Sequence, residues 1–245
     1  MTDLDTSGYW RKRLALDDPL PSDILKKYRS LYRFFRPIFF AIMNLLFGFY
    51  CKEKVYGIDN LPKPPYIMAA NHASSLDFVA VAWAMGKRKE ELYPIATKLF
   101  YDFGFARFWM KVAANVVRID TVEDFFPALR AAAQILRAGK AVYIHPEGMR
   151  SNNARILPFR PGVGVLAVET GVPLVPVYIG NSWKVLPPGS IFPFPYPLSV
   201  TFGKPIEMGP YIEQKKTEQA YDVYKNVAEE LRRRVISLQE ELQAR

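Results

Sequence analysis

Two residues in the segment 71–77 are suited to acid–base chemistry. His72 stands five positions before Asp77, with Ser74 and Ser75 between them, and the chain has only two histidines. An imidazole ordinarily titrates near neutrality, so it can take a proton from an alcohol. A carboxylate within reach fixes the tautomer of such a ring and stabilises the imidazolium that forms. The segment therefore predicts a base paired with an orienting acid.

The spacing of this pair constrains the local structure. On a continuous helix, five positions separate two side chains by about 140°, so His72 and Asp77 cannot share a helical face. Residues 66–70 are apolar and read as a short buried strand, whereas residues 76–83 read as a helix. We therefore expect a helix that starts at Ser74, with His72 in the preceding turn. The structural alternative is a capping box, in which Ser74 and Asp77 satisfy the free amides of the helix start.

The composition favours one large domain with an anionic partner. The chain has 245 residues, half of them hydrophobic, and a net charge of +9. That charge suits nucleic acid, an acidic membrane surface or a phosphorylated substrate. No zinc finger, ribonucleoprotein motif or basic zipper is present, so nucleic acid is the weakest of these. The single cysteine, Cys51, excludes an internal disulfide and fits a reducing compartment.

Residues 24–50 combine a basic cluster with an apolar run. The run covers residues 37–50, about 14 residues, whereas a spanning helix needs about 20. We interpret it as a helical arm that lies on or dips into a bilayer, with its cations at the headgroups. The alternative is a buried core helix with a basic lead-in. We divide the chain into a lead and membrane-associating arm, 1–51, and an α/β domain, 52–245. The cations of the cluster are Lys26, Lys27, Arg29, Arg33 and Arg36.

Beyond Cys51, short apolar runs alternate with helical stretches, which indicates an α/β fold with a mixed, largely parallel central sheet flanked by helices. A stripe along the last helix is expected to face the core, beside a solvated Arg232–Arg234. The proline-rich segment 187–197 predicts a loop whose aromatic side chains could touch lipid. The expected strands are 53–57, 65–70, 92–96, 115–119, 141–145, 174–179 and 198–202, and the expected helices are 75–87, 98–112, 124–138, 161–170 and 213–243.

Two further stretches place arginines after expected strands. Arg118 lies near the end of one strand, and Arg150 lies in a turn that begins after His145. Strand ends in open α/β sheets are where ligands bind, and an arginine can grip a phosphate with two donors. Two structural alternatives remain open: Arg118 could pair with Asp120, and the turn could simply face solvent.

Taken together, these stretches resemble the ordered blocks of the glycerolipid acyltransferase family. The blocks are Asn71-His72-x-Ser74-x-x-Asp77, the strand with Arg118, Pro146-Glu147-Gly148-Met149-Arg150-Ser151, and Val175-Pro176-Val177. Within the family, the chain most resembles bacterial lysophosphatidic acid acyltransferases of the PlsC type, over roughly residues 52–210. The resemblance implies His72 as the base, Asp77 as its partner, no cofactor and no metal. It also implies contacts with the acceptor phosphate from Lys98, Arg118, Glu147, Gly148 and Arg150.

The implied reaction moves a fatty acyl group from acyl-carrier protein or acyl-coenzyme A to lysophosphatidic acid, giving phosphatidic acid. The implied location is the cytoplasmic face of the inner membrane, peripheral or monotopic, on an anionic phospholipid surface and without nucleic acid. Glycerol-3-phosphate or another lysophospholipid stays open as the acceptor. Three other classes compete: a hydrolase, for which the Gly-x-Ser-x-Gly elbow is missing; a metal site on His72, Asp77 and His145; and a non-catalytic peripheral membrane protein.

Overall fold

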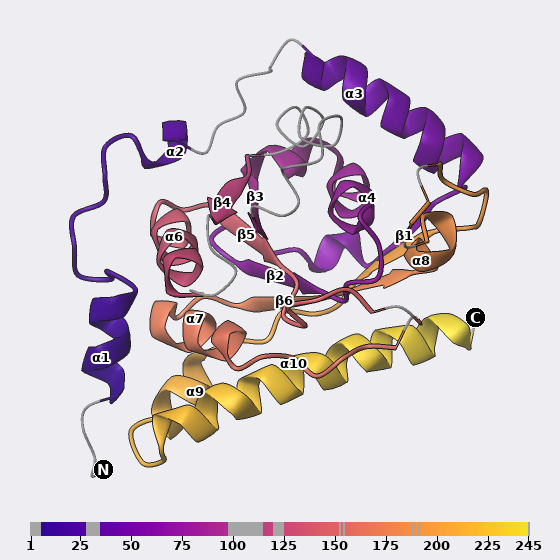
Figure 1. The fold of residues 1–245 in the computed structure, drawn as a ribbon. Helices are drawn as coiled ribbons and strands as arrows, with labels where there is room; N and C mark the ends of the chain where they lie inside the picture. Colours follow the sequence, from indigo (N-terminus) through magenta and orange to yellow (C-terminus); the bar gives the residue numbers. More distant parts are fainter. Residues whose placement is uncertain are drawn as a thin grey trace.

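The central element is a seven-stranded sheet with the order β1-β7-β6-β2-β5-β3-β4 (Figure 1). The computed structural model describes residues 6–27, 35–97, 115–119, 125–151, 153, 155–187, 189–190 and 192–244. Every neighbouring pair of strands is parallel except β6 and β7. This confirms the mixed, largely parallel sheet, and each expected strand lies within two residues of an observed one. The strands are β1 (Lys54–Tyr56), β2 (Ile67–Ala70), β3 (Leu92–Thr97), β4 (Val117–Ile119), β5 (Ala141–Ile144), β6 (Leu174–Gly180) and β7 (Ser199–Phe202).

Helices cover both faces of the sheet, which is why its central strands are apolar on both sides. Three helices, α6, α7 and α10, pack on one face, and α3 and α4 pack on the other. The helices are α1 (Thr6–Arg13), α2 (Ile24–Lys27), α3 (Phe35–Asn44), α4 (Asp77–Ala84), α6 (Phe126–Arg137), α7 (Gly162–Thr170), α8 (Ser182–Val185), α9 (Gly209–Gln214) and α10 (Ala220–Gln243). A π-helical turn, η1 (Leu45–Tyr50), continues α3, and 3-10 turns lie at η2 (Ile58–Asn60) and η3 (Gly86–Glu91).

The ends of two helices differ from the expectation. α4 begins at Asp77 rather than Ser74, because the Asp77 side chain takes the amides of the residues before it and holds them outside the helix. The carboxy-terminal helix begins at Ala220, after a break that separates it from α9. The helix expected at 98–112 lies outside the described residues.

The stripe on α10 faces the core as predicted. Val223, Val227, Leu231 and Val235 are buried in the core that α6, α7 and α10 form with the sheet. The solvated face was wrong for Arg232, whose guanidinium donates to the backbone carbonyls of Ile156 and Leu157 at 2.9 and 3.0 Å. These carbonyls lie in a loop that needs donors from outside, so the arginine ties α10 to that loop.

The amino-terminal lead packs against the main body. Leu14 and Ile24 are buried in the same core as α6, α7 and α10, and Trp10 lies against Phe126. One cation of the basic cluster, Arg36, forms an ion pair with Glu90 at 3.2 Å. The boundary at residue 51 and the membrane contact of the arm stay predictions. Among the described residues, no helix combines the length and apolar character needed to traverse a bilayer.

Candidate active site

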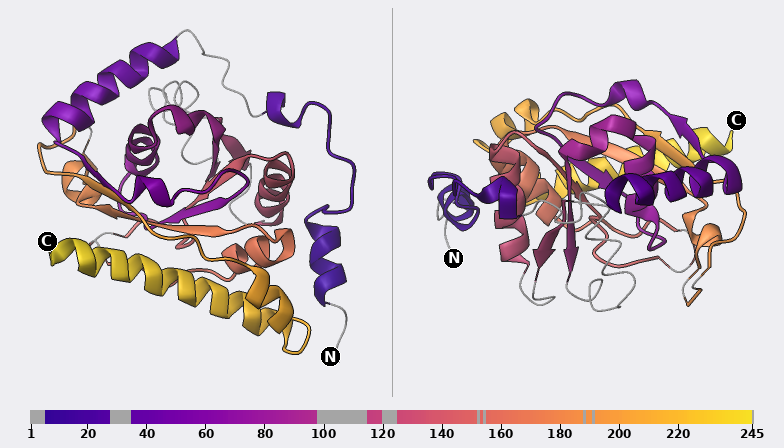
Figure 2. Two further views of the ribbon diagram at one scale, coloured as in Figure 1. Left: turned by 180° about the vertical axis from the view of Figure 1, so that it is seen from behind. Right: turned by 90° about the horizontal axis from the view of Figure 1, so that it is seen from above.

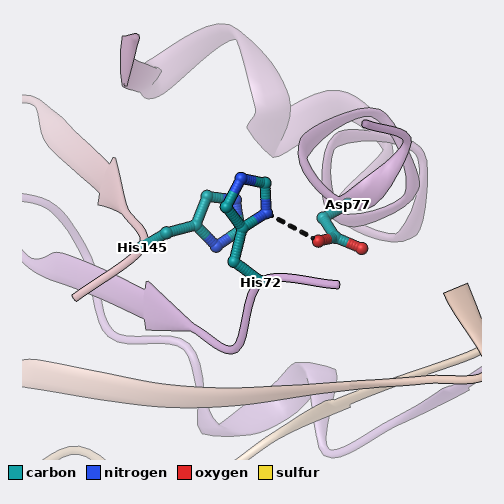
Figure 3. Close-up of side chains that lie close together, drawn as sticks. All are labelled: His72, Asp77 and His145. Carbon is teal, nitrogen blue, oxygen red and sulfur yellow. Dashed lines mark hydrogen bonds and ion pairs between the residues drawn. The ribbon is translucent and has the colours of Figure 1, made fainter. Parts of the chain in front are cut away.

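The candidate site forms where β2 and β5 end side by side. These strands are parallel neighbours with Ala69 opposite Ile144, so the residues that follow them leave the sheet at one edge. Figure 3 shows the result: His72 comes from the loop after β2, His145 from the end of β5, and Asp77 from the start of α4. His72 and His145, which are 73 positions apart in the sequence, thereby meet.

His72 and Asp77 form the expected pair. The His72 Nδ1 atom lies 2.9 Å from Asp77 Oδ2; the aspartate side chain is fully buried, and the histidine side chain is 15% exposed. The same oxygen accepts the backbone N–H groups of Ala73 at 2.8 Å and Ser74 at 2.9 Å. Asp77 therefore orients the imidazole and also caps the helix, so the functional and structural interpretations of this acid are compatible.

Asp77 is ionised in this environment. Burial works to raise the pKa of the carboxyl, but the favourable interactions, led by the hydrogen bond with His72, outweigh it, so the net pKa is lowered. An ionised carboxylate only accepts, so Nδ1 of His72 carries the hydrogen and the lone pair of the neutral ring lies on Nε2. None of the hydrogen bonds among the described residues uses Nε2. This is the tautomer that a general base requires.

The backbone of His72 is held from both sides by the turn after β5. Its N–H donates to Glu147 Oε1 at 2.9 Å, and its carbonyl accepts the N–H of Ser151 at 2.7 Å. One residue earlier, the side-chain amide of Asn71 exchanges two hydrogen bonds with the backbone of Ile179 in β6, at 2.8 and 3.1 Å. The loop that carries the base is thus bonded to β6 and to the turn after β5.

Glu147 lies beneath the site rather than at its opening. Its side chain is almost fully buried, and its second oxygen accepts the N–H of Leu157 at 3.2 Å. Burial raises the pKa of this carboxyl to about 7, although the two backbone donors favour the charged form. The expected contact between Glu147 and a substrate phosphate finds no support in this geometry; the contacts of Glu147 are those of a support for the His72 loop.

Gly148 and Arg150 have separate places in the same turn. Gly148 has φ of +74°, and a Cβ there would lie 2.6 Å from the Arg160 guanidine, so only glycine suits this turn. The exposed side chain of Arg150 donates from Nη1 to Ser75 Oγ at 2.8 Å. Ser75 belongs to the loop between His72 and Asp77, so Arg150 reaches the surface of the candidate site.

The other two expected phosphate contacts are less defined. Arg118 lies in β4 opposite Ala96 of β3, and its side chain is outside the description. Because β2, β5, β3 and β4 are parallel, β4 ends at the same sheet edge as the histidines, with β3 between it and β5. Lys98 lies outside the described residues.

The site contains one residue to which sequence reasoning gave no role in the preferred mechanism. The His145 ring stacks on that of His72, with centroids 3.8 Å apart and planes 13° apart (Figure 3). The adjacency of β2 and β5 was the missing signal, because it brings His145 beside His72. The stacked rings also disfavour the metal alternative. The lone pairs of an imidazole lie in the plane of its ring, so the lone pairs of two nearly parallel stacked rings do not converge on one metal ion.

Two candidate nucleophiles of a hydrolase have other roles. Ser74 Oγ donates to the carbonyl of Leu186 at 3.1 Å and lies 3.3 Å from the N–H of Leu76. Cys51 is buried, and burial raises the pKa of its thiol to about 11, which keeps it protonated near neutral pH. Within the described part of the chain, neither side chain is hydrogen-bonded to a histidine that could activate it.

Comparison with known proteins gives consistent matches. The 1-acyl-sn-glycerol-3-phosphate acyltransferase BAT2, chloroplastic, of Brassica napus is 28% identical over 169 residues, 68% of this chain and 48% of the relative. The 1-acyl-sn-glycerol-3-phosphate acyltransferase of Saccharomyces cerevisiae is 28% identical over 155 residues, 61% of this chain and 49% of the relative. The aligned part thus spans about half the length of these relatives.

A solved structure and a family match complete the comparison. The crystal structure of the 1-acyl-sn-glycerophosphate (LPA) acyltransferase PlsC from Thermotoga maritima shares the fold, with a TM-score of 0.64 at 23% identity, over 98% of this chain and 89% of that one. The acyltransferase family matches residues 52–180, more than half of the chain and the part that holds His72, Asp77 and the turn after β5. The chain therefore belongs to the acyltransferase family.

Proposed function

We propose that the protein transfers a fatty acyl group from an acyl thioester to the free hydroxyl of lysophosphatidic acid, giving phosphatidic acid. The observation that carries this proposal is the His72–Asp77 pair, in which a buried, ionised acid directs the lone pair of the ring away from itself. The names of the relatives supply the acceptor and the product class. Glycerol-3-phosphate and other lysophospholipids are the alternative acceptors.

The pair suits a direct transfer without an acyl-enzyme. His72 Nε2 takes the proton of the acceptor hydroxyl as its oxygen attacks the thioester carbonyl, and a carbon–oxygen bond forms. The carbon–sulfur bond then breaks, and the leaving thiolate takes the proton from the imidazolium. Asp77 stabilises the imidazolium between these steps. The donor is acyl-carrier protein or acyl-coenzyme A, and both supply the same reacting group.

Cations near the site are proposed to hold the acceptor phosphate. Arg150 has the best support, because its guanidinium contacts Ser75 at the surface of the His72 loop. Arg118 is proposed on its position at the same sheet edge, and Lys98 only on the resemblance of the sequence. A planar guanidinium suits a phosphate because it donates two parallel hydrogen bonds.

The enzyme is proposed to work at the cytoplasmic face of the inner membrane, held peripherally by its arm on an anionic surface. Two exposed aromatic groups support the membrane contact, whereas the face of the membrane rests on the resemblance of the sequence. Phe49 of η1 is 76% exposed and Phe192 of the loop after α8 is 78% exposed. The two segments meet, since the Tyr50 hydroxyl donates to the carbonyl of Pro193 at 3.3 Å, and α3 leads to the same corner of the molecule (Figure 2).

The test of the proposal is an acyl-transfer assay with the purified protein in mixed micelles. Wild type is assayed with both donor types and with lysophosphatidic acid, glycerol-3-phosphate and a monoacylglycerol that lacks the phosphate. We expect turnover with lysophosphatidic acid and at least about tenfold lower kcat/KM without the phosphate, since charge-assisted contacts are lost. Membrane binding with no thioester-dependent product would favour the non-catalytic alternative.

The variant His72→Ala examines the base directly. We expect its kcat to fall about 10²- to 10⁴-fold, the contribution of general base catalysis, while the protein still folds and unfolds cooperatively. Lys216→Ala, which removes an exposed ion pair with Glu213, is the matched control and should keep wild-type activity. Full activity in folded His72→Ala protein would rule out the mechanism.

A further inference from the structure

His145 has a defined hydrogen-bonding state. Its Nδ1 atom lies 3.2 Å from the carbonyl oxygen of Ala70, and its Nε2 atom lies 3.2 Å from the hydroxyl of Tyr143. A carbonyl only accepts, so Nδ1 carries the hydrogen, and Nε2 then accepts from the tyrosine hydroxyl. Both ring nitrogens are used, and the ring is fixed at its edge by two groups of the sheet.

The surroundings keep this ring neutral. Burial lowers the pKa of His145 to about 3, and the neighbouring His72 acts in the same direction. Tyr143 is buried beneath it, and burial raises the pKa of its hydroxyl well above the usual value, so the hydroxyl stays a donor. The ring of Tyr143 meets that of His145 edge to face, with centroids 4.9 Å apart. His145 is therefore a flat, uncharged group at neutral pH.

The stack on His145 fixes the orientation of the His72 ring plane, which the hydrogen bond to Asp77 leaves free. A single hydrogen bond at Nδ1 sets the distance between His72 and Asp77, but the ring can still swing about that bond. The His145 ring, whose centroid is 3.8 Å from that of His72 and whose plane is nearly parallel to it, blocks this rotation. The direction of Nε2 is then set by two contacts, one in the plane of the ring and one on its face.

We propose that His145 is a positioning residue: its neutral face, held by Tyr143 and Ala70, fixes the plane of the His72 ring and so aims Nε2 at the acceptor hydroxyl. This inference rests on the proposed function, in which Nε2 is the base. Neutrality matters after proton transfer as well, because an imidazolium is attracted by the face of an uncharged π system and repelled by a second cation.

The experiment compares two substitutions, one of which keeps a planar ring at position 145 and one of which does not. His145→Phe keeps a flat ring and loses both nitrogens, whereas His145→Leu keeps the apolar character and loses the flat face. We expect His145→Phe to keep kcat within about fivefold and His145→Leu to lose about 10- to 100-fold, since misplacing a catalytic group costs about this much. The acceptor KM should change little in both, because neither variant alters the groups proposed to hold the phosphate.

A second measurement does not depend on turnover. The chain has two histidines, so ¹⁵N spectra of the imidazole rings contain two sets of signals, and His145→Phe assigns them. We expect His145 to stay neutral, with its hydrogen on Nδ1, from pH 8 to pH 5. The ring protons of His72 should show stacking shifts that persist in His145→Phe and vanish in His145→Leu.

The outcomes separate this inference from the proposed function. An inactive wild type with the expected spectra would refute the acyl transfer and leave the stack established. Equal activity of the two variants, or equal loss in both with intact folding, would overturn the positioning role. If His145→Leu does not fold, the spectra decide: a His145 ring that titrates between pH 8 and pH 5 contradicts the proposal.

Discussion

At the scale of single residues, one carboxylate oxygen both orients the catalytic imidazole and caps a helix, two functions that are usually separate. Asp77 Oδ2 accepts the ring N–H of His72 and two backbone amides. The amides lock the carboxylate in place, and the carboxylate locks the ring. Because the acid is buried, it has no freedom to rotate away, so the tautomer of the base is set before any substrate binds.

The substitution Asp77→Asn should separate the role of Asp77 in catalysis from its role as a helix cap. An amide oxygen in place of Oδ2 can still accept the backbone amides, so the melting temperature should change little. The negative charge is gone, so the imidazolium loses its stabilising partner, and we expect kcat to fall about a hundredfold or more. Kinetics and thermal unfolding of the same preparation measure both effects.

Asp77→Ala is the comparison for this prediction. It removes the helix cap as well as the charge, so its free energy of unfolding should be about 1–2 kcal/mol lower than that of Asp77→Asn. An Asp77→Asn protein with wild-type kcat would show that the acid serves only the helix.

At the scale of elements, the junction between the arm and the sheet contains Glu53, a partly exposed residue whose two carboxyl oxygens are buried. Glu53 follows η1 and precedes β1, and its N–H donates to the carbonyl of Phe47 at 2.7 Å. Within the described part of the chain, neither side-chain oxygen finds a hydrogen-bond partner. Burial raises the pKa of this carboxyl to about 9, so the junction holds it protonated at neutral pH.

This raised pKa predicts a pH-dependent stability. The unfolded carboxyl titrates near its ordinary value of 4.5, so the folded state holds the proton more tightly between pH 4.5 and about 9. The stabilising contribution is complete below pH 4.5 and is lost as the pH rises toward 9, at up to about 1.4 kcal/mol per pH unit. Glu53→Gln does not titrate and should lack this pH-dependent loss, so its stability relative to wild type should grow from pH 5 to pH 8.5. Urea unfolding of both proteins across this range measures it; parallel curves would contradict the assignment.

The elements also show what the sequence could predict. The central strands were predictable because a sheet covered on both faces requires continuous apolar runs, as in Ile67–Ala70 and Leu174–Gly180. The start of α4 was not, because a side chain decides it: the Asp77 carboxylate holds two amides outside the helix.

The candidate site divides in the same way. His72 and Asp77 are five residues apart, so their pairing was accessible from local spacing. The buried position of Glu147 and the stack of His145 depend on β5 lying beside β2, a long-range pairing that local patterns do not encode. Arg232 was misplaced for the same reason, because its acceptors lie 75 residues away.

At the scale of the whole molecule, apolar groups gather at one corner. Figure 1 shows α3 leading to the corner where α8 lies, whereas α10 covers the opposite face of the sheet. The exposed apolar side chains of α3, η1 and the loop after α8 are Phe35, Ile38, Ile42, Leu45, Phe49, Tyr50, Phe192, Phe194 and Tyr196. Side chains of this kind insert into the acyl boundary of a bilayer.

The paired substitution Phe49→Ser and Phe192→Ser tests this corner as a membrane contact. Each lost phenyl group should weaken partitioning onto anionic vesicles about tenfold, given about 1.5–3 kcal/mol for burying such a side chain. Tyr221→Ser is the matched control, because Tyr221 is an exposed aromatic on α10. Vesicle sedimentation measures the bound fraction; equal loss in the control would show that the effect is not specific to this corner.

The order of the strands has a consequence for how activity arises. β5 lies between β2 and β3, and the turn that follows it holds both the N–H and the carbonyl of His72. A chain whose first hundred residues have emerged from the ribosome has the base and its acid but lacks the turn that secures them. Catalytic activity should therefore appear only after β5 has been inserted into the sheet. A partly folded chain that is already bound to a membrane would be inactive.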